Sequence, residues 1–133
     1  MNECPALQVR MCLDVQRPST DTSMASELVR RFAERFVTTQ WPPNRPLPTV
    51  YYYPPSLDLA PAKRAALHAK CVVVDEQVSF VSSANFTEAA QQKNIEVGLL
   101  VRSPLIAGRL TRHFNSLVDE GIVVPLDLRR AAM

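Results

Sequence analysis

The hydrophobic pattern divides the first half of the chain into a strand, a helix and a second strand. Residues 7–15 alternate between apolar and polar side chains and are rich in β-formers, which predicts a strand. Residues 24–38 repeat apolar side chains at helical spacing behind the candidate caps of residues 21–23, which predicts an amphipathic helix. Prolines exclude a helix or an inner strand from residues 40–48, and residues 49–53 predict a short strand.

The second half of the chain predicts a β-hairpin, one further strand and a long helix. The hairpin arms are residues 67–74 and 78–82, with a tight turn at residues 75–77. Residues 95–102 are apolar almost throughout, which predicts a central strand buried on both faces. Residues 103–120 predict a helix with a Ser-Pro start and a glycine just after its end. Shorter elements are predicted as a helical turn at residues 62–66, a helix at residues 87–92 and a last strand at residues 122–126.

The order of these elements predicts one α/β domain over residues 1–133, with helices packed in layers on a mixed β-sheet. The 133 residues, 47% of them hydrophobic, are enough for one packed core. Trp41 and the tyrosines of residues 51–53 could form a stacking surface for nucleic-acid bases. The aromatic preference of β-strands instead favours packing of these side chains against the core.

Charge and cysteine content restrict the function only weakly. The net charge of +2 and the sequence pI of 8.6 permit binding of a polyanion without requiring it. Twelve of the fifteen basic residues are arginines, which suit bidentate phosphate contacts. The three cysteines form no Cys-x-x-Cys pair, which predicts reduced thiols and no zinc site. The sequence shows neither a secretory signal nor an apolar run of about 20 residues, which predicts a cytoplasmic protein without membrane contact.

Five polar residues between positions 68 and 96 carry the candidate chemistry. His68 and Lys70 lie two residues apart on a predicted strand, so their side chains point to the same face. Burying an imidazole and an ammonium there without partners would cost several kcal/mol, so we expect an anionic ligand between them. Ser83 and Asn85 offer hydroxyl and amide donors for phosphate oxygens, and Glu96 offers a carboxylate that could orient an imidazole.

These residues resemble the signature of the phospholipase D superfamily. That signature is His-x-Lys, four residues, Asp, six residues, and then Gly-Ser-x-Asn. The chain has His68, Lys70 and Asp75 at these spacings, followed by Ser-Ser-Ala-Asn at residues 82–85, so that serine replaces the usual glycine. The downstream glutamate of the superfamily corresponds to Glu96. Residues 7–126 as a whole are most similar to the phospholipase-D-like proteins of DISARM anti-phage systems.

The resemblance implies a layered phospholipase-D-like fold and a metal-independent mechanism without a cofactor. His68 attacks phosphorus to form a phosphohistidine, and a second histidine protonates the leaving oxygen. Lys70, Ser83 and Asn85 stabilise charge on the phosphoryl oxygens. The resemblance implies a structural role for Asp75, and it implies that Glu96 orients a histidine, either that of its own chain or that of a partner.

The chain contains only one His-x-Lys motif, whereas a complete site of this superfamily needs two. The chain's second histidine, His113, lies on a predicted helix without a lysine two residues on, so we expect it at the surface. A second copy must then supply the other motif, which predicts a homodimer. The resemblance also implies that a strand and a helix common in the superfamily are missing before residue 7, as in an N-terminally shortened domain.

Three functions follow from the resemblance. The first is a nuclease that cleaves DNA in anti-phage defence, with nucleic acid, a second copy and other defence-system proteins as partners. The second is a phospholipid-processing enzyme, although such enzymes usually carry both motifs in one chain and the synthases add membrane segments. The third is a non-catalytic accessory protein that retains the motif, because a fold and a motif do not prove turnover.

Overall fold

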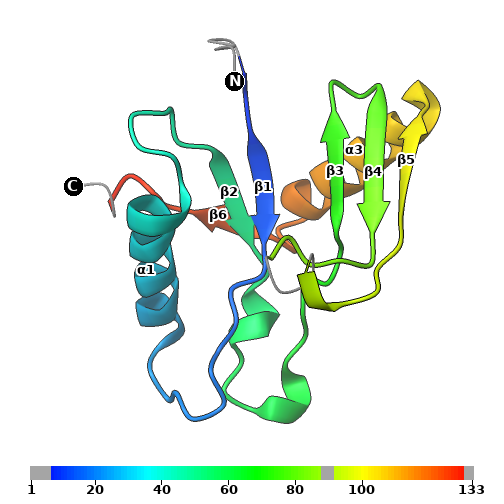
Figure 1. Ribbon diagram of the computed structural model, residues 1–133. Helices are drawn as coiled ribbons and strands as arrows, with labels where there is room; N and C mark the ends of the chain where they lie inside the picture. The colour runs from blue at the N-terminus through cyan, green and yellow to red at the C-terminus, as the bar shows by residue number, and fades with distance from the viewer. Residues whose placement is uncertain (1–6, 88–91, 131–133) are drawn as a thin grey trace. The chain divides into compact units, whose positions relative to one another are not determined.

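The computed structural model describes residues 7–87 and 92–130, and the chain divides into two compact units. The first unit comprises Met1–Leu67 and Gly121–Met133, and the second comprises His68–Glu120. Each unit contains one three-stranded sheet (Figure 1). The predicted α/β class is confirmed, but the strands form two small sheets where the sequence predicted one. The strand that ends before residue 53 and the strand that begins after residue 70 belong to different sheets. Between them, prolines favour the 3₁₀ turns η2 (Pro54–Leu57) and η3 (Pro61–Lys63) over a strand.

The sheet of the first unit has the strand order β1-β2-β6. Strand β1 (Arg10–Leu13) pairs in parallel with β2 (Thr49–Tyr52), and β2 pairs antiparallel with β6 (Val124–Leu126). All three strands lie within the strands that the sequence predicted. The parallel pair requires a long crossover, and helix α1 (Ala25–Arg35) provides it.

Helix α1 begins and ends differently from the prediction. Its N-cap is Met24, which makes no side-chain cap bond, so the polar residues before it do not cap the helix. At its C-terminal end the chain continues in the π-helical turn η1 (Phe36–Gln40). The hydroxyls of Thr38 and Thr39 donate to the carbonyl oxygens of Glu34 and Arg35 at 2.8 and 2.7 Å, which stabilises this wider turn.

The core of the first unit lies between α1, the sheet and the 3₁₀ turns. Trp41 stacks on Phe36 with ring centroids 5.8 Å apart, and both Trp41 and Tyr52 pack against this core. These contacts confirm the core interpretation of those two aromatic residues. The buried members of the core are Val15, Leu28, Ala33, Phe36, Val50, Leu57, Leu126 and Leu128.

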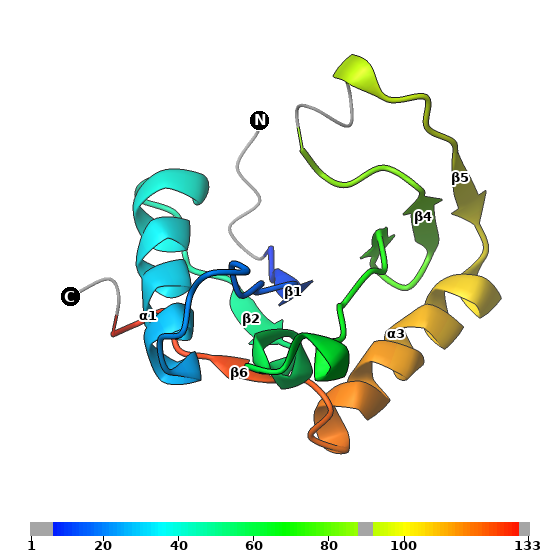
Figure 2. The same ribbon diagram turned by 90° about the horizontal axis from the view of Figure 1, so that it is seen from below.

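The second unit is an antiparallel sheet with a helix packed against it. Strand β3 (Cys71–Val74) and strand β4 (Val78–Ser82) form the predicted hairpin, and β5 (Gly98–Arg102) pairs with β4. Helix α3 (Pro104–Asp119) contacts β3 and β4 and lies along one side of the sheet (Figure 2). The helix predicted over residues 87–92 falls mostly on residues outside the described ranges.

Strand β5 is an edge strand in this sheet, so the prediction of a central strand buried on both faces is wrong. The order is β3-β4-β5, and the side chain of Leu100 is 61% exposed. A continuous apolar run shows that both faces of a strand carry apolar side chains, but it does not show which elements cover those faces. The exposure of β5 therefore leaves apolar surface on this sheet, and that surface bears on the candidate site.

Candidate active site

The hairpin of the second unit positions Lys70 at the start of β3. The N–H of Ser82 donates to the carbonyl oxygen of Lys70 at 2.9 Å, which extends the β3–β4 ladder by one pair. Side chains alternate along a strand, so Lys70 shares its sheet face with Val72 and Val74. The strand predicted from residue 67 begins at Cys71, and His68 precedes it in extended sequence.

His68 and Lys70 are in direct contact, whereas their spacing predicted two side chains on one face with an anionic ligand between them. Lys70 Nζ lies 2.9 Å from both ring nitrogens of His68, and it also donates to the carbonyl oxygen of His68 at 2.8 Å. A neutral imidazole has one nitrogen that accepts, so the ammonium donates to that nitrogen. Both side chains are exposed in this contact, where an incoming ligand can reach them.

Ser83 and Glu96 form a second contact where β4 ends and β5 is about to begin. Ser83 Oγ donates to Glu96 Oε2 at 2.5 Å, and the N–H of Val97 donates back to Ser83 Oγ at 3.1 Å. The N–H of Ser83 donates to the carbonyl oxygen of Val97 at 3.0 Å. These bonds hold the hydroxyl and the carboxylate together across the two strand ends.

Three neighbours hold the pKa of the Glu96 carboxyl below its ordinary value. The largest cause is the hydrogen bond from Ser83, followed by the hydrogen bond from Asn94 Nδ2, which lies 3.1 Å from Glu96 Oε1. The positive charge of Lys70 adds to this lowering of the pKa. Glu96 is therefore ionised near neutral pH, and the ammonium of Lys70 lies within its electrostatic reach.

Glu96 does not bond to His68 of its own chain, which leaves the histidine of a partner as the other alternative that the resemblance implied. Among the described residues, the carboxylate of Glu96 bonds to Ser83 and Asn94, while His68 bonds to Lys70. Hydrogen bonds between Ser83 and Val97 bring the hydroxyl of Ser83 to this carboxylate. Asn85 follows two residues after Ser83, where its carbonyl oxygen accepts from the N–H of Thr87 at 2.7 Å.

Asp75 lies in the turn of the hairpin, as predicted. Asp75 and Glu76 have φ angles of 50° and 53°, in the left-handed region, and the N–H of Gln77 donates to the carbonyl oxygen of Val74 at 2.9 Å. Aspartate tolerates this backbone conformation better than most residues. The turn geometry supports the structural role implied for Asp75.

Two residues that sequence reasoning did not assign also shape the site. Asn94 holds Glu96 through its side-chain amide, and its position two residues earlier in the chain was the available signal. Ser82 stands where the superfamily has glycine, and its Oγ accepts from the N–H of Ala84 at 3.0 Å. This side-chain bond stabilises the loop that carries Ser83 and Asn85.

His113 lies on α3 and is exposed, as expected. Its ring contacts Phe114 edge to face, with centroids 5.4 Å apart. Within residues 7–87 and 92–130, no three His, Cys, Asp or Glu side chains form a group that could hold a metal ion. No helix in that part of the chain is long and apolar enough to cross a membrane.

The family model described as "Cardiolipin synthase, PLD-like domain" matches residues 8–118. The match covers most of the chain, and the protein therefore belongs to the phospholipase-D-like family. Membership of this family implies a phosphodiesterase-type enzyme, and the two α/β units are consistent with such a domain. No curated protein and no solved structure matches the chain.

Proposed function

We propose that this protein is a metal-independent phosphodiesterase that cleaves DNA through a phosphohistidine at His68. The observation that carries the proposal is the direct contact between His68 and Lys70, with Lys70 also within electrostatic reach of Glu96. The proposed nucleophile, His68, is thus in contact with a cation, and the charge of that cation acts on the carboxylate of Glu96. A phosphodiester needs such a cation, because charge on its oxygens grows during attack.

The proposed reaction proceeds in two displacements. A ring nitrogen of His68 attacks phosphorus, a P–N bond forms, and the P–O bond to the leaving oxygen breaks. The leaving oxygen takes a proton from His68 of a second copy. Water then attacks phosphorus and gives a proton to that second histidine, and the P–N bond breaks to restore His68.

Lys70 has two successive roles in this proposal. In the free protein its ammonium donates to the lone pair of the accepting nitrogen of His68, and that lone pair cannot attack while the bond persists. A bound phosphate offers anionic oxygens, which form stronger charge-assisted bonds with the ammonium. Substrate binding would then draw Lys70 from His68 and free the nucleophile as the phosphate arrives.

The same sheet face supports the proposed homodimer. Val72, Val74 and Leu100 share the face of Lys70, and their exposed fractions are 44%, 53% and 61%. Contiguous exposed apolar side chains mark interaction surfaces. A second copy that covers this face would also bring a second His-x-Lys motif, which the single motif of the chain requires.

DNA is the substrate that the remaining observations favour. The net charge of +2 suits a polyanion, and the similarity to DISARM phospholipase-D-like proteins suggests phage DNA, a cytoplasmic location and other defence proteins as partners. The family description names cardiolipin synthase, so phospholipid is the alternative substrate. The third candidate function is a non-catalytic accessory role, which an assay must distinguish from the two enzymatic functions.

The test is cleavage of single- and double-stranded DNA in excess EDTA by the parent, His68→Ala and His113→Ala. His113 is the chain's other histidine and lies exposed on α3, so its substitution is the matched control. We expect cleavage by the parent and by His113→Ala, and a loss of at least about a thousandfold in His68→Ala, because a nucleophile is removed. Phosphatidylglycerol vesicles are assayed in parallel.

Each outcome separates the three functions. Turnover of vesicles but not of DNA would identify the lipid enzyme. A folded protein that turns over neither substrate would favour the accessory role. DNA cleavage that persists in His68→Ala would contradict the proposed nucleophile.

A further inference from the structure

A cavity of about 270 Å³ lies in the first unit, and part of its lining closely precedes His68 in sequence. It is lined by Gln16, Arg17, Ser56, Arg64, Ala65 and Ala66, all members of the first unit. Two of the six are arginines and none is acidic. The lining therefore combines two positive charges with neutral polar and small side chains.

Arg17 is a buried cation whose partners are all main-chain carbonyls. It is 6% exposed, and its Nε donates to the carbonyl oxygen of Leu57 at 2.8 Å. One terminal nitrogen donates to the carbonyl oxygens of Asp21 and Ser23 at 2.9 and 2.7 Å. These bonds use three of the five N–H donors of a guanidinium, and no carboxylate of a described residue pairs with it.

Arg64 also lines the cavity, and it too donates to main-chain carbonyl oxygens. Its Nε donates to the carbonyl oxygen of Asp58 at 2.8 Å, and a terminal nitrogen donates to that of Leu59 at 3.3 Å. No ion pair within the described ranges involves Arg64. Two guanidinium groups thus line one cavity with only carbonyl dipoles to balance them.

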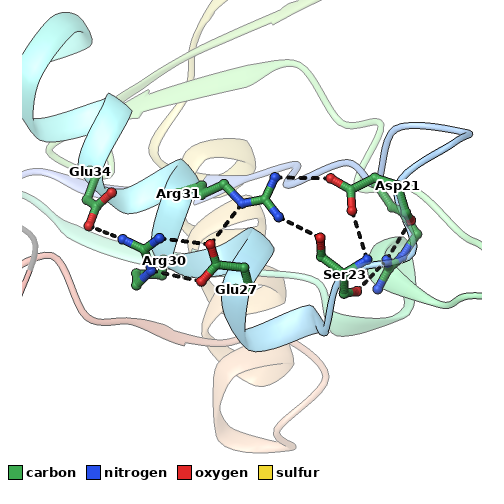
Figure 3. Close-up of polar contacts among 7 residues, drawn as sticks. Asp21, Ser23, Glu27, Arg30, Arg31 and Glu34 are labelled. Carbon is green, nitrogen blue, oxygen red and sulfur yellow. Dashed lines mark hydrogen bonds and ion pairs between the residues drawn. The ribbon is translucent and has the colours of Figure 1, made fainter.

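The arginines of helix α1 show the opposite pattern (Figure 3). Exposed Arg30 pairs with Glu27 and Glu34, and exposed Arg31 pairs with Glu27 and with Asp21. Buried charges normally have counter-ions and exposed ones can rely on water. Here the buried arginine is the one without a carboxylate partner among the described residues, and a bound anion would supply a counter-charge.

The other polar residues near the cavity are already engaged. Ser56 Oγ lies 2.6 Å from the carbonyl oxygen of Val15, which occupies its hydroxyl proton. Asp14, two residues before Gln16, accepts from Gln16 Nε2 at 2.8 Å and from the N–H of Leu67 at 3.2 Å. Its carboxylate is held by neutral donors and does not neutralise either arginine of the cavity.

We infer that this cavity binds a phosphate group between Arg17 and Arg64. The planar guanidinium presents parallel donors that match phosphate oxygens, and two such groups suit one phosphate. A volume of about 270 Å³ has room for a phosphate and several waters, since a water takes about 30 Å³ in the liquid. The phosphate group is either part of a nucleic-acid backbone or a free phosphate or phosphomonoester. The first of these alternatives rests on the proposed function.

The first arm of the test is thermal unfolding in inorganic phosphate and in chloride at equal ionic strength. The parent, Arg64→Gln and Arg129→Gln are compared, because Arg129 is an exposed arginine of the same unit that does not line the cavity. We expect phosphate to raise the Tm of the parent and of Arg129→Gln equally, and by less than half as much in Arg64→Gln. Comparing the shift within each variant removes any loss of stability caused by the substitution itself.

The second arm distinguishes the source of the phosphate. Binding of a single-stranded oligonucleotide is titrated at several salt concentrations with each variant in a His68→Ala background, so that the DNA stays intact. A backbone contact predicts about tenfold weaker binding in Arg64→Gln and a slope of log K against log salt that is smaller by about 0.7. A change in the phosphate arm alone would assign a free phosphate or phosphomonoester.

An equal phosphate shift in the parent and Arg64→Gln would overturn the inference. Absence of nuclease activity would not, because the phosphate arm measures binding without turnover. The two proposals therefore fail independently.

Discussion

Lys70 has two neighbours of opposite character. Its ammonium donates to His68, and its charge helps to lower the pKa of the Glu96 carboxyl. Ser83 makes the larger contribution to that lowering through its hydroxyl. The charge of Lys70 thus acts on Glu96 from a distance, while its ammonium donates to His68.

The depressed pKa of Glu96 predicts a defined dependence of stability on pH. A carboxyl whose folded pKa lies below its unfolded value stabilises the fold above the ordinary value of 4.5. That contribution disappears as pH falls through the folded pKa. The parent should therefore have a higher Tm than Glu96→Gln near pH 6, and the difference should shrink below pH 4.5, as measured by thermal unfolding from pH 6 to pH 3.

Ser83→Ala provides the companion variant for that experiment. Removing the largest cause of the lowered pKa moves the folded pKa back toward 4.5, so the pH window shifts upward. A Tm difference between parent and Glu96→Gln that stays constant down to pH 3 would contradict the assigned contacts.

At the scale of elements, β5 depends on a close approach that only glycine permits. A Cβ at Gly98 would lie 2.9 Å from an edge carbon of the Phe80 ring and 3.1 Å from the carbonyl oxygen of Val81. Gly98 pairs with Ser82, directly beside the Ser83–Glu96 contact. The glycine therefore lets Phe80 lie over β5 while β5 stays paired to β4.

Gly98→Ala should destabilise the protein by about 1–3 kcal/mol, because it overpacks a paired strand. Gly108→Ala is the matched control, since a Cβ there meets only Arg112 at 3.5 Å, an ordinary contact. Replacing a glycine inside a helix should raise stability by about 0.5–1 kcal/mol. Urea unfolding measures both, and equal effects of the two substitutions would refute this reading of Gly98.

The sequence predicted the elements well because periodicity records which side of a strand or helix is apolar. It placed His68 and Lys70 on one face, since residues two apart in a strand share a face, but it expected an anion between them and not direct contact. It could not predict that β5 is an edge strand, because strand order depends on pairing between distant segments. The partner of Glu96 was equally out of reach, because it depends on how the chain returns from Ser83 to Val97.

At the scale of the whole molecule, each unit has its own sheet, and the single His-x-Lys motif lies in the second. The face that carries Lys70 also exposes Val72, Val74 and Leu100. If two copies form a dimer through this face, each copy alone should expose apolar side chains beside its single His-x-Lys motif. The proposed homodimer would bury this surface and complete the site in one step.

Leu100→Asp should weaken self-association at least about tenfold, because it places a charge in the proposed apolar interface. Leu59→Asp is the control: Leu59 is 61% exposed, as is Leu100, but it lies in the first unit. Light scattering over a range of concentrations gives the dimer dissociation constant of each variant, and DNA cleavage should fall with the dimer fraction. Equal dissociation constants for the two variants would exclude this face as the interface.

The central claim is that His68 forms a covalent bond to phosphorus, and trapping that bond tests it most directly. Labelled DNA is mixed with the protein in excess EDTA, the reaction is stopped in alkaline denaturant, and the peptides are analysed by mass spectrometry. We expect a nucleotide adduct on His68 that is stable in alkali, labile in acid, absent from His68→Ala and present in His113→Ala. An adduct on another residue, or EDTA-resistant turnover that never yields an adduct, would contradict it.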